Sequence, residues 1–160
     1  IKMFTEMIKN IFIPSIIAII VAGMKLSLDE YDKVKAIVPG LFQFNENEMY
    51  TQAALAITDN ELYLYDDNAP AQIMGDVYHY PILKRIKLDD ISMALDEKIV
   101  RNAQLDNMGR LNFLMEETEE NILFYYYLSD KKDIADFIKE LADAGIKTRK
   151  RKVDLSPENL

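Results

Sequence analysis

The sequence predicts a mainly β (α+β) domain, an antiparallel barrel or sandwich of about seven strands followed by one helix. Two observations carry this prediction. Short apolar runs separated by turn residues fill residues 39–128 at the spacing of successive hairpins. An amphipathic stretch over residues 129–144 then follows, and its apolar stripe must be buried against the sheet.

The clearest hairpin joins residues 53–57 to residues 61–65. Between them lies Thr58-Asp59-Asn60, and Asp and Asn tolerate the left-handed backbone of tight turns. In the second run two tyrosines alternate with two leucines, which predicts that each pair occupies its own face of a strand. Further strands are predicted at 41–44, 77–83, 91–95, 99–105, 111–115 and 122–128.

The helix over residues 129–144 has signals at both ends. Ser129 is the predicted N-cap, and Gly145 stands where a helix commonly ends on a left-handed glycine. The predicted apolar stripe consists of Ile134, Phe137, Ile138, Leu141 and Ala142.

Residues 1–38 predict a helical extension before the strands. The run 11–24 is almost wholly apolar, and as a helix it would span about 21 Å, short of a hydrocarbon core of roughly 30 Å. Three interpretations stay open: a buried or oligomer-facing helix, a secretory signal or short membrane anchor, and a helix lying on a membrane surface. A second helix is predicted to begin at Ser27 and to end at Pro39-Gly40.

Three stretches of the chain resemble bacterial pleckstrin-homology-like (PH-like) domains. The first is the hairpin LAITDNELYLY at 55–65, the second is YPILKRIKLDDI at 80–91, and the third comprises the two strands and the helix over 111–141. The resemblance implies a strongly bent antiparallel barrel closed by the C-terminal helix. It divides the chain into an N-terminal helical extension at 1–38, a PH-like domain at 39–146 and a basic, polar tail at 147–160.

Composition and motifs exclude several functions. The 27 acidic against 19 basic residues leave a net charge of −8, which disfavours nucleic acid as a partner. Without cysteine and with one histidine, His79, the chain lacks the residues for thiolate or multi-histidine metal sites. We interpret His79 as a rim residue of a strand, the acids at 116–120 as a hairpin tip and Asp89-Asp90 as turn residues. No catalytic, cofactor-binding or metal-binding residue is predicted, and we expect no enzyme activity.

Charge distribution also argues against a phosphoinositide ligand. Eukaryotic PH domains that hold phosphoinositides use basic residues between their first two strands, and the corresponding stretch here, 45–48, is acidic. No basic residue lies between Lys35 and Lys84. This acidic window contains seven acidic residues: Glu46, Glu48, Asp59, Glu61, Asp66, Asp67 and Asp76.

Two groups of residues are candidates for contact with a partner or with lipid. The segment 147–152 holds five cations: Lys147, Arg149, Lys150, Arg151 and Lys152. It can be a solvated tail, a contact with anionic lipid, or a segment that docks on the acidic window of a neighbouring copy. The second group is Tyr125 and Tyr127, because the run Tyr125-Tyr126-Tyr127 alternates faces and so directs a ring outward.

The resemblance and these features together predict a non-enzymatic interaction or self-assembly module. We expect it to be cytoplasmic, to need no cofactor, and to bind itself or another protein rather than phosphoinositides. The alternative is a peripheral membrane protein held by residues 1–24 and by the cations at 147–152, because stable membrane binding needs two weak anchors.

Overall fold

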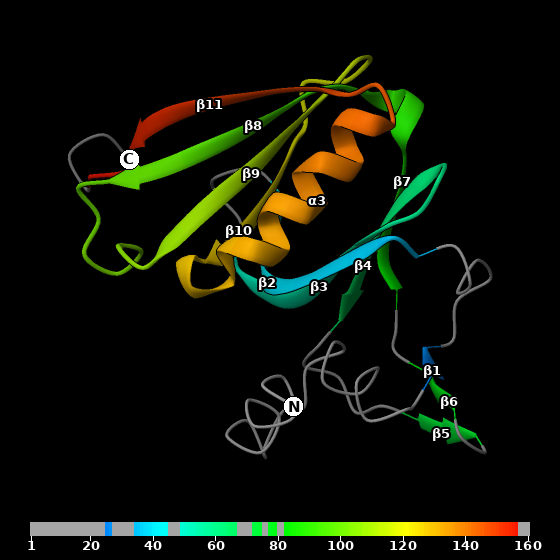
Figure 1. Ribbon diagram of the computed structural model, residues 1–160. Helices are drawn as coiled ribbons and strands as arrows, with labels where there is room; N and C mark the ends of the chain where they lie inside the picture. The colour runs from blue at the N-terminus through cyan, green and yellow to red at the C-terminus, as the bar shows by residue number, and fades with distance from the viewer. Residues whose placement is uncertain are drawn as a thin grey trace.

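The computed structural model describes residues 25–26, 34–44, 49–66, 72–74, 77–79 and 82–156 (Figure 1). Eight strands form one sheet in the order β11-β8-β9-β10-β2-β3-β4-β7. In chain order these strands are β2 (Ala36–Phe44), β3 (Thr51–Ile57), β4 (Glu61–Asp66), β7 (Ile82–Lys87), β8 (Ile91–Val100), β9 (Met108–Met115), β10 (Asn121–Tyr127) and β11 (Lys147–Asp154). Neighbours are antiparallel except β11 and β8, which run parallel.

A second sheet of three short strands has the order β1-β6-β5. They are β1 (Lys25–Leu26), β5 (Gln72–Met74) and β6 (Val77–His79). His79 lies on a strand as predicted, but the single strand predicted over 77–83 is wrong, because β6 and β7 belong to different sheets. The residues of the apolar run 11–24, most of the second predicted helix and the acidic loop 45–48 lie outside the described residues.

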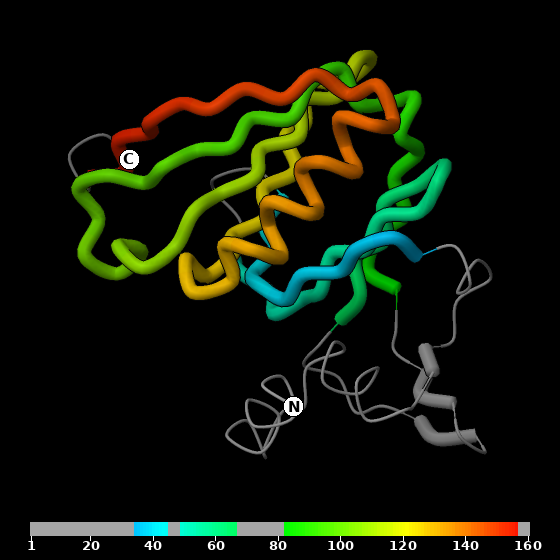
Figure 2. Tube along the Cα trace, viewed as in Figure 1, coloured from blue at the N-terminus to red at the C-terminus, as the bar shows by residue number. Residues whose placement is uncertain are grey.

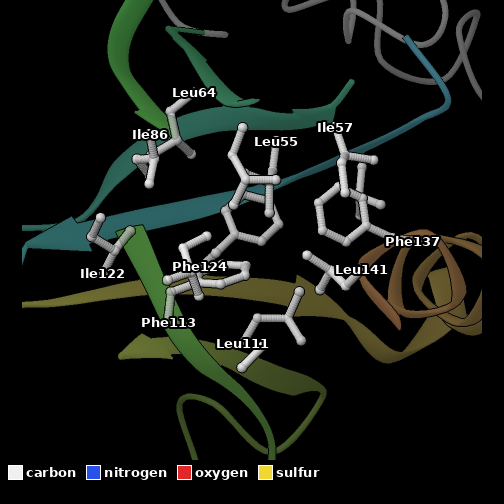
Figure 3. Packing of buried hydrophobic residues seen from close by; sticks show 14 of the residues in the cluster. Leu55, Ile57, Leu64, Ile86, Leu111, Phe113, Ile122, Phe124, Phe137 and Leu141 are labelled. Carbon is white, nitrogen blue, oxygen red and sulfur yellow. The ribbon is translucent and has the colours of Figure 1, made fainter. Parts of the chain in front are cut away.

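The large sheet bends around one hydrophobic core, and helix α3 (Lys131–Asp143) lies across its concave side (Figures 1 and 2). The sheet stays open because its end strands β7 and β11 do not pair with each other. The 3-10 turns Leu88–Asp90 and Leu128–Asp130 lead into β8 and α3. Figure 3 shows the core, where leucine, isoleucine and phenylalanine side chains from both halves of the sheet meet Phe137 and Leu141 of α3. The prediction of a mainly β fold with one C-terminal helix is confirmed, whereas the predicted antiparallel barrel is wrong: the sheet is open, has eight strands and includes one parallel pair.

The hairpin of β3 and β4 forms as predicted. Ile57 pairs with Leu62 across the turn, and the Thr58 hydroxyl oxygen accepts hydrogen bonds from the backbone N–H groups of Asn60 and Glu61. Leu62 and Leu64 point into the main core, whereas the tyrosines of β4 lie on the other face and are also fully buried.

Helix α3 agrees with the prediction except at its start. The N-cap is Asp130 rather than Ser129, because a 3-10 turn over 128–130 delays the helix. Gly145 has a φ of 87°, and its N–H bonds to Ala142 O while the N–H of Ile146 bonds to Leu141 O. These two bonds satisfy the carbonyls of Leu141 and Ala142 in the last turn of the helix. Of the predicted stripe, Ile134, Phe137 and Leu141 are buried, Ile138 is half-buried and Ala142 is exposed.

The predicted end of the second helix at Pro39-Gly40 is wrong, because both residues lie inside β2. Helical spacing of apolar residues in this region is overridden by pairing with β3, which begins at Ala36. Pairing with β10 on the other side begins only at Gly40. Pro39, which has no N–H to donate, therefore lies where β2 has a single neighbour.

Gly40 is required where β2 and β10 come together. A Cβ atom there would lie 2.0 Å from the backbone oxygen of Tyr125 and 2.8 Å from Cζ of Phe124. We expect Gly40→Ala to lower the free energy of unfolding by about 1–3 kcal/mol, because the strands must move apart to admit the methyl group. Urea denaturation followed by circular dichroism measures this, and an unchanged midpoint would show that the close approach is not needed.

Two strand predictions are corrected by the register of β8 and β9. Residues 91–100 form one continuous strand, and residues 101–107 form the loop to β9 instead of a strand over 99–105. In that loop Arg101 has a φ of 60°, which breaks the extended backbone after β8. Residues 147–154, assigned to a polar tail from composition, form β11 and belong to the sheet.

Candidate functional site

The five cations of the segment 147–152 lie on β11, the end strand of the large sheet. The strand pairs in parallel with β8 without a register shift, from Lys147 opposite Met93 to Asp154 opposite Val100. Both ends are held by buried side chains, since Ile146 belongs to the main core and Leu155 to a second apolar cluster. The N–H of Leu155 bonds to Val100 O, and its carbonyl accepts a bond from Asn102 Nδ2. The segment is thus an anchored part of the sheet.

Alternation along β11 distributes its cations over two faces. Lys147, Arg149 and Arg151 share the outer face, which looks away from α3, and Lys150 and Lys152 share the face that carries α3. All five are exposed. Lys152 lies opposite Lys98 of β8, an exposed residue that adds a further positive charge to the same region.

Arg151 differs from its neighbours because it pairs with a buried carboxylate. Its Nε donates to Glu97 Oε2 at 2.5 Å, while Arg110 Nε donates to Glu97 Oε1 at 2.7 Å. Glu97 is 0% exposed and Arg110 is 1% exposed. No ion pair to Lys147, Arg149, Lys150 or Lys152 is present in the described part of the chain.

The Glu97 carboxylate belongs to a row of hydrogen-bonded side chains, the polar ladder, that crosses five strands on the outer face. Beyond Arg110, Nη1 donates to the Tyr125 hydroxyl at 3.2 Å, and that hydroxyl donates to Gln43 Oε1 at 2.9 Å. The ladder thus consists of Arg151, Glu97, Arg110, Tyr125 and Gln43, on β11, β8, β9, β10 and β2. The buried Arg110 guanidinium thus lies between the Glu97 carboxylate and the Tyr125 hydroxyl, which supply the counterion and hydrogen bonds that a buried charge requires.

Burial and hydrogen bonding together set the charges of Arg110 and Tyr125 in the ladder. Burial acts against the charged form of Arg110, but its hydrogen bonds to Tyr125 and Glu97 outweigh this and leave its pKa raised. Burial also disfavours the charged form of Tyr125, which for a tyrosine raises the pKa, here to about 12, despite the nearby Arg110 cation. Near neutral pH the ladder therefore has a fixed charge pattern, with a positive Arg110 and a neutral Tyr125.

The two candidate tyrosines differ in accessibility. Tyr125 is 1% exposed and packs edge-to-face against Tyr50, with ring centroids 5.2 Å apart, so it offers no contact surface in this structure. Tyr127, two residues further on the same face, is 36% exposed. Tyr126 points to the opposite side, where its hydroxyl donates to Asp96 at 2.6 Å. The predicted alternation of the three rings is thus confirmed.

A small hollow of about 60 Å³ lies beside the ladder. Arg110, Tyr125 and Gln43 line it together with Tyr50, Asn102 and two leucines. Its volume is far below the roughly 300–1,000 Å³ of pockets that bind organic ligands. The hollow has room for a few water molecules rather than for a substrate.

Two further properties bear on function. Among the described residues, no group of three or more His, Cys, Asp or Glu side chains is arranged to hold a metal ion. Over the same residues, no helix is both long and apolar enough to cross a membrane.

Sequence reasoning missed Glu97, Arg110 and the role of Arg151. A signal was present, because Glu97 stands at period-two spacing between Leu95 and Ile99 and so falls on an apolar face. Its partner could not be found, since the predicted strand over 99–105 placed the wrong residues opposite β9. The composition of 147–152 identified the cations, but it did not predict that they lie on a strand of the sheet.

Comparisons with known proteins identify the fold. No protein-family model matches the chain, and no curated protein matches it. Among solved structures, the chain is similar to Vav1 inhibited by an allosteric inhibitor, with 12% identity, a TM-score of 0.50, and coverage of 90% of this chain and 34% of that one. It is also similar to the Spt16D Pob3N heterodimer, with 11% identity, a TM-score of 0.46, and coverage of 76% and 57%.

The likeness to the Vav1 structure supports a PH-like fold for this chain. In its described part the fold departs in two ways from the strands and closing helix predicted from the sequence. The first is β11, added after the helix that ends the predicted PH-like domain, and the second is the small sheet of β1, β6 and β5. The chain spans about a third of the Vav1 chain that it matches.

Proposed function

We propose that the chain is a non-enzymatic interaction module that binds an acidic segment of a protein partner through β11. One observation carries the proposal: a strand at the end of the sheet presents five exposed cations, of which only Arg151 has an ion pair among the described residues. In a chain with a net charge of −8, such a concentration of positive charge gives a local field that attracts anions.

The arrangement of the cations favours a protein segment over a lipid surface. A membrane is flat and meets one face of a strand, whereas these cations lie on both faces of β11. A narrow ligand running along the strand can contact both sets. The proposal is for binding without catalysis, because the polar groups gathered on the outer face bond to one another and the adjoining hollow is small.

Fluorescence anisotropy with labelled oligoglutamate tests the proposal at low salt. The wild-type protein should bind the probe, and binding should weaken as salt rises. The variant Lys147→Glu, Arg149→Glu, Lys150→Glu and Lys152→Glu should bind at least about fourfold more weakly, since each of the four lost ion pairs contributes roughly 0.2–1 kcal/mol. Arg151 is left in place so that Glu97 keeps its partner.

A matched control carries the same change in net charge elsewhere. It reverses four exposed lysines of β7 and α3, namely Lys87, Lys131, Lys132 and Lys139. This variant should bind the probe nearly as well as the wild type. Equal loss in both variants would show that net charge alone governs binding and would overturn the proposal. Binding to phosphatidylserine vesicles but not to oligoglutamate would also overturn it, in favour of a membrane surface.

A further inference from the structure

The outer edge of β11 provides more than charge. β11 ends the strand order of the large sheet and runs along its margin in Figures 1 and 2. On one side it pairs with β8 over eight residues in an uninterrupted register. In a paired strand every second residue directs its backbone N–H and C=O groups away from the neighbouring strand, here toward the open edge of the sheet. A long, regular edge of this kind is a template for one more strand.

The side chains on this edge select which strand can be added. A second copy of β11 would place cations opposite cations, and like charges directly opposite each other destabilise a strand pair. An acidic strand would instead place carboxylates opposite Lys147, Arg149, Lys150 and Lys152. The same residues that prevent pairing between copies of this chain therefore favour an acidic partner.

The edge is also held in place before any partner arrives. Arg151 is tied to the buried Glu97, which is tied in turn to Arg110. Ile146 and Leu155 anchor the two ends of the strand in apolar clusters. A partner strand would therefore not have to order β11 on binding, which removes part of the entropic cost of association.

We propose that an acidic, extended segment of a partner protein adds to β11 as a ninth strand of the sheet. The inference rests on the proposed function and states how the acidic segment is bound: by backbone hydrogen bonds along the edge, with its carboxylates on the cations of both faces. Main-chain bonds provide affinity in this mode, and alternate side chains provide specificity.

Two peptides of equal charge test the inference. In the first, an octapeptide of sequence EETEETEE, the glutamates fall on both faces of an extended strand. In the second, both threonines are replaced by proline, which has no N–H to donate and disfavours an added strand. We expect the proline peptide to bind wild-type protein on the order of tenfold more weakly. Amide hydrogen exchange of the complex with the first peptide should show new protection at alternate residues of β11.

The outcomes separate this inference from the proposed function. Equal binding of both peptides, with no new amide protection on β11 but with loss of binding in the four-residue β11 variant, would overturn strand addition and leave charge-based binding standing. Failure of both peptides to bind would overturn the proposed function itself. Protection on β7, the opposite end of the sheet, in place of β11 would also refute the inference.

Discussion

Replacing Glu97 by glutamine is expected to lower the free energy of unfolding by about 3–5 kcal/mol. The substitution removes the buried anion that faces the Arg110 guanidinium at 2.7 Å, so a positive charge stays in the interior without that counterion. It also removes the ion pair between Arg151 and the sheet. Chemical denaturation monitored by circular dichroism gives the change in unfolding free energy.

Two further variants show whether the effect comes from the lost charge pair. Glu117→Gln makes the same chemical change on the exposed hairpin loop and should leave stability unchanged. The double variant Glu97→Met with Arg110→Met should recover much of the loss, because two apolar side chains of similar volume leave no uncompensated charge. A double variant as unstable as Glu97→Gln would contradict this account of the ladder.

Truncation of Phe137 to alanine is the second change with a large expected effect. Phe137 is 0% exposed and lies at the middle of the face that α3 turns toward the core (Figure 3). The variant loses the transfer free energy of the ring and leaves a cavity, which together cost about 3–5 kcal/mol. The unfolding midpoint in guanidinium chloride should fall with little change in slope.

The neighbouring position provides a control for Phe137→Ala. Asp136 is exposed on the same helix, and Asp136→Ala should leave stability nearly unchanged, since alanine also favours helix. A similar loss in both variants would mean that the helix, rather than its packing, is what the substitutions disturb. A negligible loss in Phe137→Ala would show that α3 is not needed to close the core.

Local signals were enough to predict the parts of the fold that are determined locally. The turn at Thr58-Asp59-Asn60 and the glycine at 145 act within a few residues, and the structure has both as expected. β2 was missed at its start because the helical spacing near Ile37 is a weaker determinant than pairing with β3 and β10. No signal within residues 34–40 reports those distant partners.

The candidate site, too, has a part that the sequence predicts locally and a part that depends on distant strands. The five cations at 147–152 are evident from the sequence, but Lys- and Arg-rich segments are common in solvated tails, so the sequence does not predict a strand there. Recognising β11 needs its partner β8, which lies two strands and a helix earlier in the chain. The burial of Glu97 depends in turn on both Arg110 and Arg151, so it follows only from the complete sheet.

The place of β11 in the chain has a consequence for the order of folding. Lys147 meets Met93 only after β9, β10 and α3 have been laid down between them, so this pairing closes a long loop. Pairings that close long loops form slowly, and the pairing of β2 with β10, from Gly40 to Tyr126, closes a longer loop still. The edge proposed here for partner binding needs the chain through Asp154, and it exists only after β11 has paired with β8.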